Sequence, residues 1–223
     1  RVGLTPDSAR KIVASGHDVL IQKDAGANIG FFDEQYLSAG AKILNSGEDV
    51  YKSSEMIVKV KEPIPEEYPF LRDDLTLFTY LHLAGDPENA KKLIDTGVTG
   101  IAYETVTAAD GSMPLLAPMS TIAGQLAIVV GSYHLLKHNK GKGVMIGKLD
   151  SIEPRVVTVI GAGVAGTQSI SKALDNHALV KVLDTSESKL QQLESEFGSS
   201  NIEYILSTSD SVQSAINESD MVI

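Results

Sequence analysis

The feature that most constrains the fold of this chain is a glycine-rich turn between an apolar strand and a helix. The β-branched run Val157–Ile160 leads directly into the pattern G-x-G-x-x-G. The first glycine permits the sharp bend, the second lets backbone N–H groups approach a pyrophosphate, and the third lets the helix pack against the strand. The pyrophosphate then lies at the positive N-terminus of the helix. The predicted phosphate-binding residues are Gly161, Ala162, Gly163, Val164, Ala165 and Gly166.

The next predicted strand, Val180–Leu183, is followed by an acidic residue. Asp184 comes 18 residues after Gly166, where a carboxylate can accept hydrogen bonds from an adenosine ribose. It would also repel a 2′-phosphate, so NAD is favoured over NADP. Lys189 and Ser207 follow one helix turn and one strand later, near the expected adenosine. The alternative is a glycine-rich turn that binds no nucleotide, followed by a surface aspartate.

Extended and helical patterns alternate along the whole chain, which is typical of parallel sheets covered by helices. Turn residues at Asp110–Pro114 mark a boundary. We therefore predict an α/β protein with two doubly wound domains, 1–115 and 116–223, the second a Rossmann domain with about its first four strands. Both are expected to be incomplete. Strands are expected at 17–21, 41–44, 56–60, 75–81, 100–104, 156–160, 180–183 and 202–206 and at the chain end, and helices at 6–15, 33–39, 87–96 and 186–197 and from 164.

A long helix is predicted after the boundary, with Ser120 as its N-cap. At 1.5 Å per residue it would be roughly 27 Å long, enough to bridge two domains. Its apolar residues recur at steps of four and three, which is typical of one helix face. This stripe consists of Ile122, Leu126, Val129, Tyr133 and Leu136.

Composition excludes several classes of protein. Of the 223 residues 43% are hydrophobic, which is ordinary for a globular chain and not for a disordered or fibrous one. No apolar run approaches the roughly 18 residues of a membrane span, and no signal-peptide pattern opens the sequence. The absence of Cys excludes disulfides and thiolate metal sites and fits a cytoplasmic location, and no metal is expected. A formal charge of −10 without a basic stripe argues against nucleic-acid binding.

The first half of the chain carries three further features. Lys59 and Lys61 alternate with valines, so both would project from one face of a strand, and Lys61 would lie near its carboxyl end. His82 follows another apolar strand and could meet Lys61 there, because α/β sheets bind ligands at this edge. Arg1 precedes the first helix. The alternatives are solvated lysines, a structural histidine and a frayed terminal arginine. These patterns alone predict a two-domain, dinucleotide-dependent enzyme of unassigned chemistry.

Over nearly its whole length the chain resembles the alanine dehydrogenase family, which includes the NAD-binding subunit of proton-translocating transhydrogenase. The matching runs are RVGLTP at 1–6, VKVKEP at 58–63, LFTYLHLA at 77–84, IAYETV at 101–106 and PLLAPMS at 114–120. The stretch YLHL at 80–83 resembles the dehydrogenase and not the transhydrogenase subunit. The resemblance implies reversible oxidative deamination of L-alanine to pyruvate and ammonia with NAD, in a cytoplasmic homo-hexamer without nucleic-acid or membrane partners.

The resemblance also implies roles for individual residues. Domain 1–115 would be the substrate domain, in which Arg1 and Lys61 bind the substrate and His82 is the catalytic acid and base. In the NAD-binding domain, Ser120 would contact the nucleotide at the head of the long helix, as would Asp184 and Lys189 on the adenosine side. Met119 would border the nicotinamide pocket.

The family pattern extends beyond both ends of this chain. A strand before the residue that matches Arg1 is absent, and so are an acidic partner of the histidine, an asparagine near the nicotinamide and a returning segment of the first domain. We therefore expect the chain to be the middle of a longer protein and to be inactive alone. Two alternatives stay open, namely a transhydrogenase-type NAD-binding component and a truncated, non-catalytic nucleotide-binding product.

Overall fold

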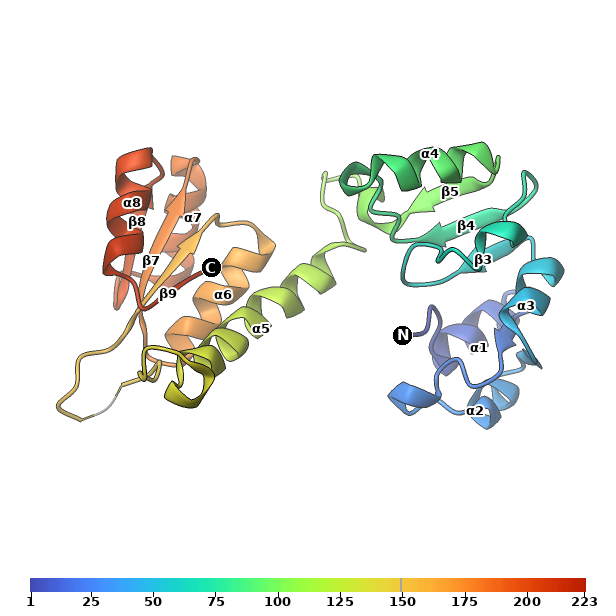
Figure 1. Ribbon diagram of the computed structural model, residues 1–223, viewed down its shortest axis with the longest axis horizontal. Helices are drawn as coiled ribbons and strands as arrows, with labels where there is room; N and C mark the ends of the chain where they lie inside the picture. Colours follow the sequence, from blue (N-terminus) through green and yellow to red (C-terminus); the bar gives the residue numbers. More distant parts are fainter. Residues whose placement is uncertain (149) are drawn as a thin grey trace. The chain divides into compact units, whose positions relative to one another are not determined.

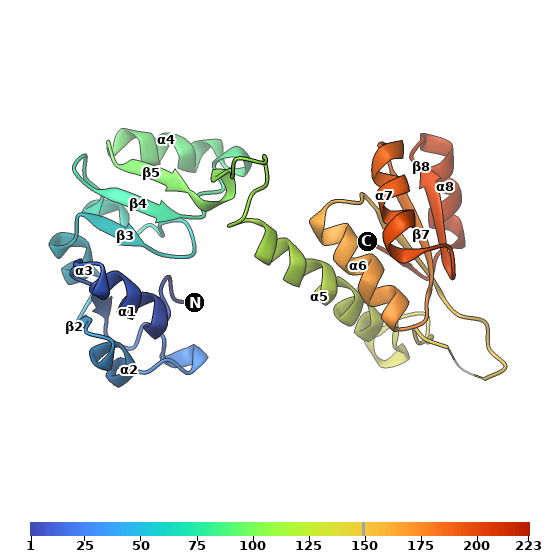
Figure 2. The same ribbon diagram turned by 180° about the vertical axis from the view of Figure 1, so that it is seen from behind.

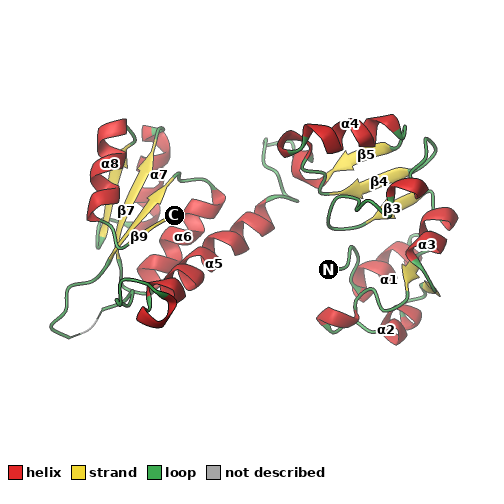
Figure 3. Ribbon diagram, in the orientation of Figure 1, coloured by secondary structure: helices red, strands yellow, loops and turns green. Residues whose placement is uncertain are grey.

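The computed structural model describes residues 1–148 and 150–223 and divides the chain into two compact units, Arg1–Leu116 and Ala117–Ile223 (Figure 1). Within these residues every pair of neighbouring strands runs parallel. Helices alternate with the strands along the chain (Figure 3). The prediction of an α/β fold with parallel sheets is confirmed.

The first unit contains two parallel sheets, one of order β1-β2 and one of order β3-β4-β5. Local capping chemistry explains where two of its helices begin. The Thr5 side chain accepts the N–H of Ser8 ahead of α1, and that of Asp86 accepts the N–H of Asn89 ahead of α4. The elements are α1 (Pro6–Ala14), β1 (Leu20–Gln22), α2 (Asp33–Ser38), β2 (Lys42–Leu44), α3 (Gly47–Ser53), β3 (Met56–Val58), β4 (Thr76–Thr79), α4 (Pro87–Asp95) and β5 (Thr99–Ala102), with short 3₁₀ turns between some of them.

The core of the first unit consists of two clusters, one for each sheet. The cluster around β3 and β4 is formed by Tyr51, Ile57, Leu71, Leu75, Leu77, Leu81 and Leu93. Full burial of such a side chain contributes about 1.5–3 kcal/mol. Leu81 belongs to this cluster, so the backbone that follows β4 is anchored to the core up to the residue before His82.

The second unit is one four-stranded parallel sheet of order β8-β7-β6-β9. The order reverses at β6, which makes the edge between β6 and β9 a topological switch point. Val157 and Val159 of β6 are buried on the side of α6, while the buried Thr158 hydroxyl lies 2.5 Å from Ser219 Oγ after α8. Figures 1 and 2 show α6 and α8 on opposite faces. The elements are α5 (Ala117–Leu135), β6 (Val156–Ile160), α6 (Val164–Asp175), β7 (Leu179–Asp184), α7 (Glu187–Phe197), β8 (Ile202–Leu206), α8 (Ser209–Glu218) and β9 (Met221–Val222).

The long helix α5 lies in the second unit and differs from its prediction in two respects. It begins at Ala117, so Ser120 lies in its first turn and is not its N-cap. The predicted apolar stripe is largely exposed: Ile122 by 60%, Leu126 by 51%, Val129 by 52% and Tyr133 by 54%. The buried residues are instead Gly124 and Ile128. A Cβ on Gly124 would lie 2.1 Å from the Ala165 carbonyl oxygen, so the small residue allows α5 and α6 to approach closely.

Several strands are shorter than predicted. β1 begins at Leu20 and not at 17, and β3 ends at Val58 and not at 60. Backbone pairing continues beyond β3, because Lys59 N–H donates to the Phe78 carbonyl and Tyr80 N–H donates to the Val60 carbonyl, each at 3.2 Å. The helices α3 and α8 were not predicted. In the described parts of the chain no helix combines the length and apolarity needed to cross a membrane.

Candidate functional site

The glycine-rich turn between β6 and α6 has the backbone geometry that its sequence predicts. Gly161 has a φ of 101°, which favours glycine, and its N–H donates to the Leu183 carbonyl at 2.7 Å. A Cβ on Gly166 would lie 1.9 Å from the Gly161 carbonyl oxygen, so only glycine fits there. Gly163 stands at the N-cap of α6 without a side chain, and the first N–H groups of the helix lack a side-chain cap. This helix N-terminus is therefore suited to an anionic group such as a phosphate.

A cavity of about 530 Å³ lies between the glycine-rich turn and the first half of α5. Its other wall includes the end of β6 and Ile223, at the switch point of the sheet. Six of the predicted cofactor residues line it, namely Ser120, Gly161, Gly163, Val164, Ala165 and Gly166. Ala123, Gly124 and Ala127 of α5 line it as well and were not predicted. A glycine inside a helix destabilises it by about 1 kcal/mol relative to alanine. The presence of Gly124 within a predicted helix was therefore the sequence signal for a close packing contact.

Asp184 links the end of β7 to the glycine-rich turn. Its Oδ2 accepts the N–H of Ala162 at 2.7 Å and its Oδ1 accepts the N–H of Ser186 at 2.9 Å. Hydrogen bonds from Ala162 first and then from Ser186 hold the pKa of this carboxyl below its usual value, with smaller contributions from the Thr185 backbone and the Lys189 charge. An ionised carboxylate thus stands at the carboxyl end of the sheet, with lone pairs left for the hydroxyls of a sugar.

The other residues expected near adenosine lie around Asp184 and outside the cavity. Ser207 follows β8, and its N–H donates to the Asp184 carbonyl at 2.9 Å. Lys189 stands in the first turn of α7, and its Nζ donates to Gln192 Oε1 at 3.3 Å. Both Lys189 and Ser207 therefore adjoin Asp184, the acidic residue that follows the second strand of this sheet.

Met119, which was predicted to border the nicotinamide pocket, lies in the first turn of α5. It is 40% exposed and does not line the cavity.

In the first unit, the structure brings the segments of Lys61 and His82 to one edge of the β3-β4-β5 sheet. They follow the carboxyl ends of the adjacent parallel strands β3 and β4. The buried Thr79 hydroxyl donates to the Lys61 carbonyl at 2.8 Å, and the Tyr80–Val60 backbone bond lies beside it. The Lys61 side chain is 45% exposed, and its Nζ lies 3.8 Å from Glu62 Oε2. This ammonium group can therefore reach a ligand at the sheet edge.

Lys59 has a different environment from Lys61. Its ammonium group is ion-paired with Glu67, and both side chains are mostly buried. The same Glu67 oxygen accepts the N–H of Ile64 at 2.8 Å. Lys59 thus holds the segment after β3 in place.

The N-terminal segment lies against the same part of β3. A Cβ on Gly3 would lie 2.5 Å from the Val58 carbonyl oxygen, so Gly3 permits a close approach of the two backbones. Arg1, two residues earlier, is exposed. The segment that carries Arg1 therefore passes the carboxyl end of the strand that leads to Lys61.

His82 has an unusual backbone conformation, with φ 53° and ψ 30° in the left-handed region. Its ring lies 6.0 Å from the ring of Tyr80, and Tyr80 packs edge-on against Tyr103 at 4.9 Å. Glu104 accepts the backbone N–H of His82 at 2.7 Å. Tyr80, Tyr103 and Glu104 were not predicted as site residues from the sequence. Their only signal was membership of two runs that resemble the family, since strand register decides which of them meet.

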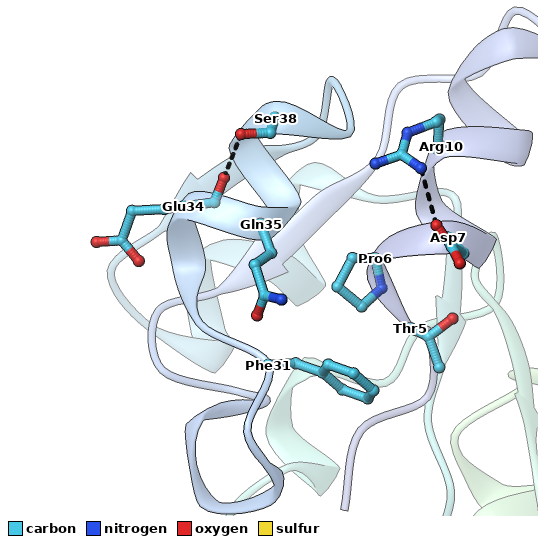
Figure 4. A pocket seen from close by; sticks show the side chains of 8 residues that line it. All are labelled: Thr5, Pro6, Asp7, Arg10, Phe31, Glu34, Gln35 and Ser38. Carbon is cyan, nitrogen blue, oxygen red and sulfur yellow. Dashed lines mark hydrogen bonds and ion pairs between the residues drawn. The ribbon is translucent and has the colours of Figure 1, made fainter.

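Another cavity lies in the first unit and is lined by none of the predicted site residues. It measures about 520 Å³ and lies between α1 and α2 (Figure 4). Two of its polar contacts join lining residues to each other: Arg10 pairs with Asp7 at 2.8 Å, and Ser38 Oγ donates to the Glu34 carbonyl at 2.7 Å. We assign it no role in the candidate site.

The parallel sheet with its switch point, the glycine-rich turn and the acidic residue after the second strand define a dinucleotide-binding α/β protein. Comparison with known families is more specific. Residues 1–123 match the alanine dehydrogenase/PNT N-terminal domain, and residues 127–223 match the C-terminal domain. The chain therefore belongs to the alanine dehydrogenase/PNT family, and the predicted resemblance is confirmed.

Individual relatives agree with this assignment. The chain is 41% identical to the alanine dehydrogenase of Methanococcus maripaludis and 43% identical to that of Mycobacterium tuberculosis. All of the chain is aligned in both cases, and it spans about 60% of the length of these curated relatives. A solved L-alanine dehydrogenase superimposes with a TM-score of 0.91 at 42% identity, over 100% of this chain and 61% of that one. A transhydrogenase from Sinorhizobium meliloti shares the fold, with a TM-score of 0.81 at 24% identity over 100% and 64% of the two chains.

Proposed function

We propose that the protein carrying this chain is an NAD-dependent alanine dehydrogenase. It would convert L-alanine, NAD⁺ and water into pyruvate, ammonium, NADH and a proton, and catalyse the reverse reaction. The observation that carries the proposal is the meeting of the Lys61 and His82 segments at one sheet edge, in a chain about 42% identical to alanine dehydrogenases. A cytoplasmic location and a homo-hexamer are further proposals that follow from the resemblance.

Arg1 and Lys61 are proposed to bind the substrate. An arginine fork can grip a carboxylate with two charge-assisted hydrogen bonds. The ammonium group of Lys61 can stabilise negative charge that develops on the substrate oxygen. The acidic chain makes such local cations necessary, because its overall field disfavours an anionic substrate.

His82 is proposed to be the general acid and base. An imidazole side chain can both give and take a proton, which the role of general acid and base requires. In the direction of deamination, His82 would remove a proton as water adds to the imine carbon and would return one to the leaving ammonia. Its exposed position after β4 leaves the ring accessible to a substrate.

The cofactor is proposed to be NAD, which when bound would accept the hydride from the substrate carbon. The turn Gly161–Gly166 would hold the pyrophosphate, and the uncapped N-terminus of α6 and the two glycine-only positions support this fit. Asp184 would bind the ribose hydroxyls, with Lys189 and Ser207 beside it. Ser120 would contact the nucleotide from the cavity wall. Met119, outside that wall, would border the nicotinamide by the family resemblance.

The proposal is tested by NADH-dependent reductive amination of pyruvate with the protein that carries this chain. Lys61→Ala and His82→Ala should each lower kcat/KM by at least about 100-fold, the size of effect expected for general acid–base catalysis. The exposed Lys52 and His17 provide matched controls, and Lys52→Ala and His17→Ala should keep the parental rate. Parental kcat/KM in both site variants would overturn the assigned roles.

Two other outcomes would identify the alternatives. Hydride exchange between nucleotides without amination of pyruvate would indicate a transhydrogenase-type component. NADH binding without turnover in the protein that carries this chain would indicate a non-catalytic nucleotide-binding product. The higher identity to dehydrogenases, about 42% against 24%, favours the dehydrogenase.

A further inference from the structure

The backbone at His82 adopts a conformation that is uncommon for residues other than glycine. With φ 53° it lies in the left-handed region, which glycine enters readily and other residues enter rarely. Such conformations persist where surrounding contacts overdetermine them, and they cluster at functional sites. The contacts that hold His82 there therefore decide where its ring is presented.

The Glu104 carboxylate makes these contacts. Its Oε1 accepts the N–H of His82 at 2.7 Å and the N–H of Leu81 at 3.1 Å, and its Oε2 lies 3.3 Å from the Leu81 nitrogen. One side chain thus binds two consecutive amides at the point where the chain leaves the strand direction.

The sheet explains why a side chain is needed at this place. The pairing of β4 with β5 ends at Thr79 and Ala102, after which the β5 chain turns into a 3₁₀ helix over Tyr103–Thr105. The amides of Leu81 and His82 lie beyond this last pair and use the Glu104 carboxylate in place of a strand carbonyl.

Aromatic packing fixes the residue that precedes Glu104. The Tyr103 ring lies edge-on to Phe78 at 4.4 Å and to Tyr80 at 4.9 Å. Both partners belong to β4 or to the residues that follow it. The segment that carries Glu104 is therefore packed against the residues of β4 and those that follow it. This packing leaves the Glu104 carboxylate little freedom to move away from the amides that it accepts.

We propose that Glu104 is a positioning residue for His82. By accepting the amides of Leu81 and His82, its carboxylate holds the left-handed turn and presents the imidazole at the sheet edge that also carries Lys61. The inference rests on the proposed function, in which His82 is the acid and base. It concerns the backbone of His82, so it assigns Glu104 no proton transfer of its own.

The test compares four variants of the protein that carries this chain. Glu104→Gln keeps an oxygen at the acceptor position, Glu104→Asp keeps the charge but withdraws it by one methylene, and Glu104→Ala removes the acceptor. Glu66→Ala, at an exposed glutamate of the same unit, is the matched control. A misplacement of about 1 Å can lower a rate about 100-fold. We expect kcat to be highest in Glu104→Gln, lower in Glu104→Asp and lowest in Glu104→Ala, with a loss of about 10- to 100-fold in Glu104→Ala.

The Michaelis constant separates positioning from general damage. Because Arg1 and Lys61 keep their places, the KM for pyruvate should change by less than about three-fold in folded Glu104→Gln and Glu104→Asp, well within the effect of one hydrogen bond. If Asp matched or exceeded Gln in kcat, the charge and not the placed oxygen would be responsible, and the proposal would be wrong. This comparison holds even if Glu104→Ala does not fold.

A double variant tests whether Glu104 acts through His82. Residues that act as a unit have non-additive effects, so Glu104→Gln or Glu104→Asp should not slow the His82→Ala protein further. A slowing by the same factor as in the parent would overturn the proposal. If His82→Ala itself keeps the parental rate, the proposed function is wrong and this inference fails with it. If His82→Ala is inactive while every Glu104 variant keeps parental kcat, only the positioning role is wrong.

Amide hydrogen exchange provides a readout that does not depend on activity. The N–H groups of Leu81 and His82 should be protected from exchange in the parent and less protected in Glu104→Asp, with Glu104→Gln closer to the parent. Exchange at Tyr80, whose N–H is bonded to Val60, should be unchanged. Equal protection of Leu81 and His82 in all variants would show that the carboxylate does not hold them.

Discussion

The candidate functional residues of the two units are positioned by different means. In the second unit, the glycine-rich turn depends on backbone geometry, and its residues lie within six positions of each other in the sequence. In the first unit, Arg1, Lys61 and His82 depend on the register of neighbouring strands and on contacts such as Thr79 with Lys61. A short local sequence pattern therefore predicts the glycine-rich turn of the second unit. The placement of Arg1, Lys61 and His82 in the first unit can be read only from the folded sheet.

The largest expected effect is on the stability of the glycine-rich turn, where two glycines should respond differently to alanine. Gly166→Ala places a Cβ 1.9 Å from the Gly161 carbonyl oxygen, so we expect a loss of about 3 kcal/mol in the free energy of unfolding of this chain. Gly163→Ala has free space around its Cβ and should change stability by less than about 1 kcal/mol. Urea unfolding measures the first effect, and NADH calorimetry should show weakened binding in both variants. Equal stability of the two would contradict the backbone argument.

The next effect separates two lysines of the first unit. Lys59→Ala removes a mostly buried ion pair with Glu67 and should lower the free energy of unfolding by about 2 kcal/mol. Lys61→Ala removes a more exposed ammonium group and should change stability by less than about 0.5 kcal/mol while lowering kcat/KM for pyruvate. Thermal or urea unfolding beside steady-state kinetics measures both. The assignment of Lys59 to structure would be wrong if its variant lost activity without losing stability.

Asp184 should contribute a stability that depends on pH. Its pKa is lowered in the folded chain by the amides of Ala162 and Ser186. Its contribution should therefore be present above the unfolded pKa of about 3.9 and be lost as the pH falls through the lower folded value. At neutral pH, Asp184→Asn should lower the free energy of unfolding by about 1–2 kcal/mol relative to the parent. This difference between the two proteins should become smaller below about pH 4. Asp175→Asn, at an exposed aspartate, serves as control, and a constant difference would argue against this origin.

The same residue should control cofactor choice. Asp184→Ala should reduce the preference of the protein for NAD over NADP by at least about 10-fold, since a repulsive carboxylate is removed. Binding constants for both reduced nucleotides measure the change. Unchanged discrimination would show that Asp184 does not face the ribose.

The smallest effect is expected on the outer face of α5. Ile122 is 60% exposed, so Ile122→Glu should change the free energy of unfolding of this chain by less than about 0.5 kcal/mol. Ile128→Ala, at a residue buried in the core of the same helix, should lower it by about 2–4 kcal/mol. A large loss in Ile122→Glu would show that the stripe is packed within the chain.

The sequence predicted most elements whose determinants are local. The turn at Gly161, the strand before it and the acidic residue after the next strand were all found, because glycine, β-branched residues and strand length act over a few positions. The helix α8 was missed, although Thr208 at its N-cap accepts the N–H of Ser211. Its residues are mostly polar, so the hydrophobic pattern that supported the other helices was weak there.

The rest depended on contacts distant in the sequence. The stripe on α5 predicted a face, but which face packs was decided by the close approach of Gly124 to Ala165, 41 residues away. Glu104 likewise follows β5, and only the register of β4 with β5 brings it to His82. No spacing rule in the sequence contains this information.

The bond between Asp184 and Ala162 has a consequence for the engineering of cofactor preference. The carboxylate that is proposed to bind the ribose also accepts an amide N–H of the glycine-rich turn. Removing it to admit a 2′-phosphate would also leave the Ala162 N–H without its acceptor, which costs about 1–3 kcal/mol when the group is buried. A redesign for NADP therefore needs two changes in this fold: one that relieves the repulsion and one that supplies a new acceptor for the turn.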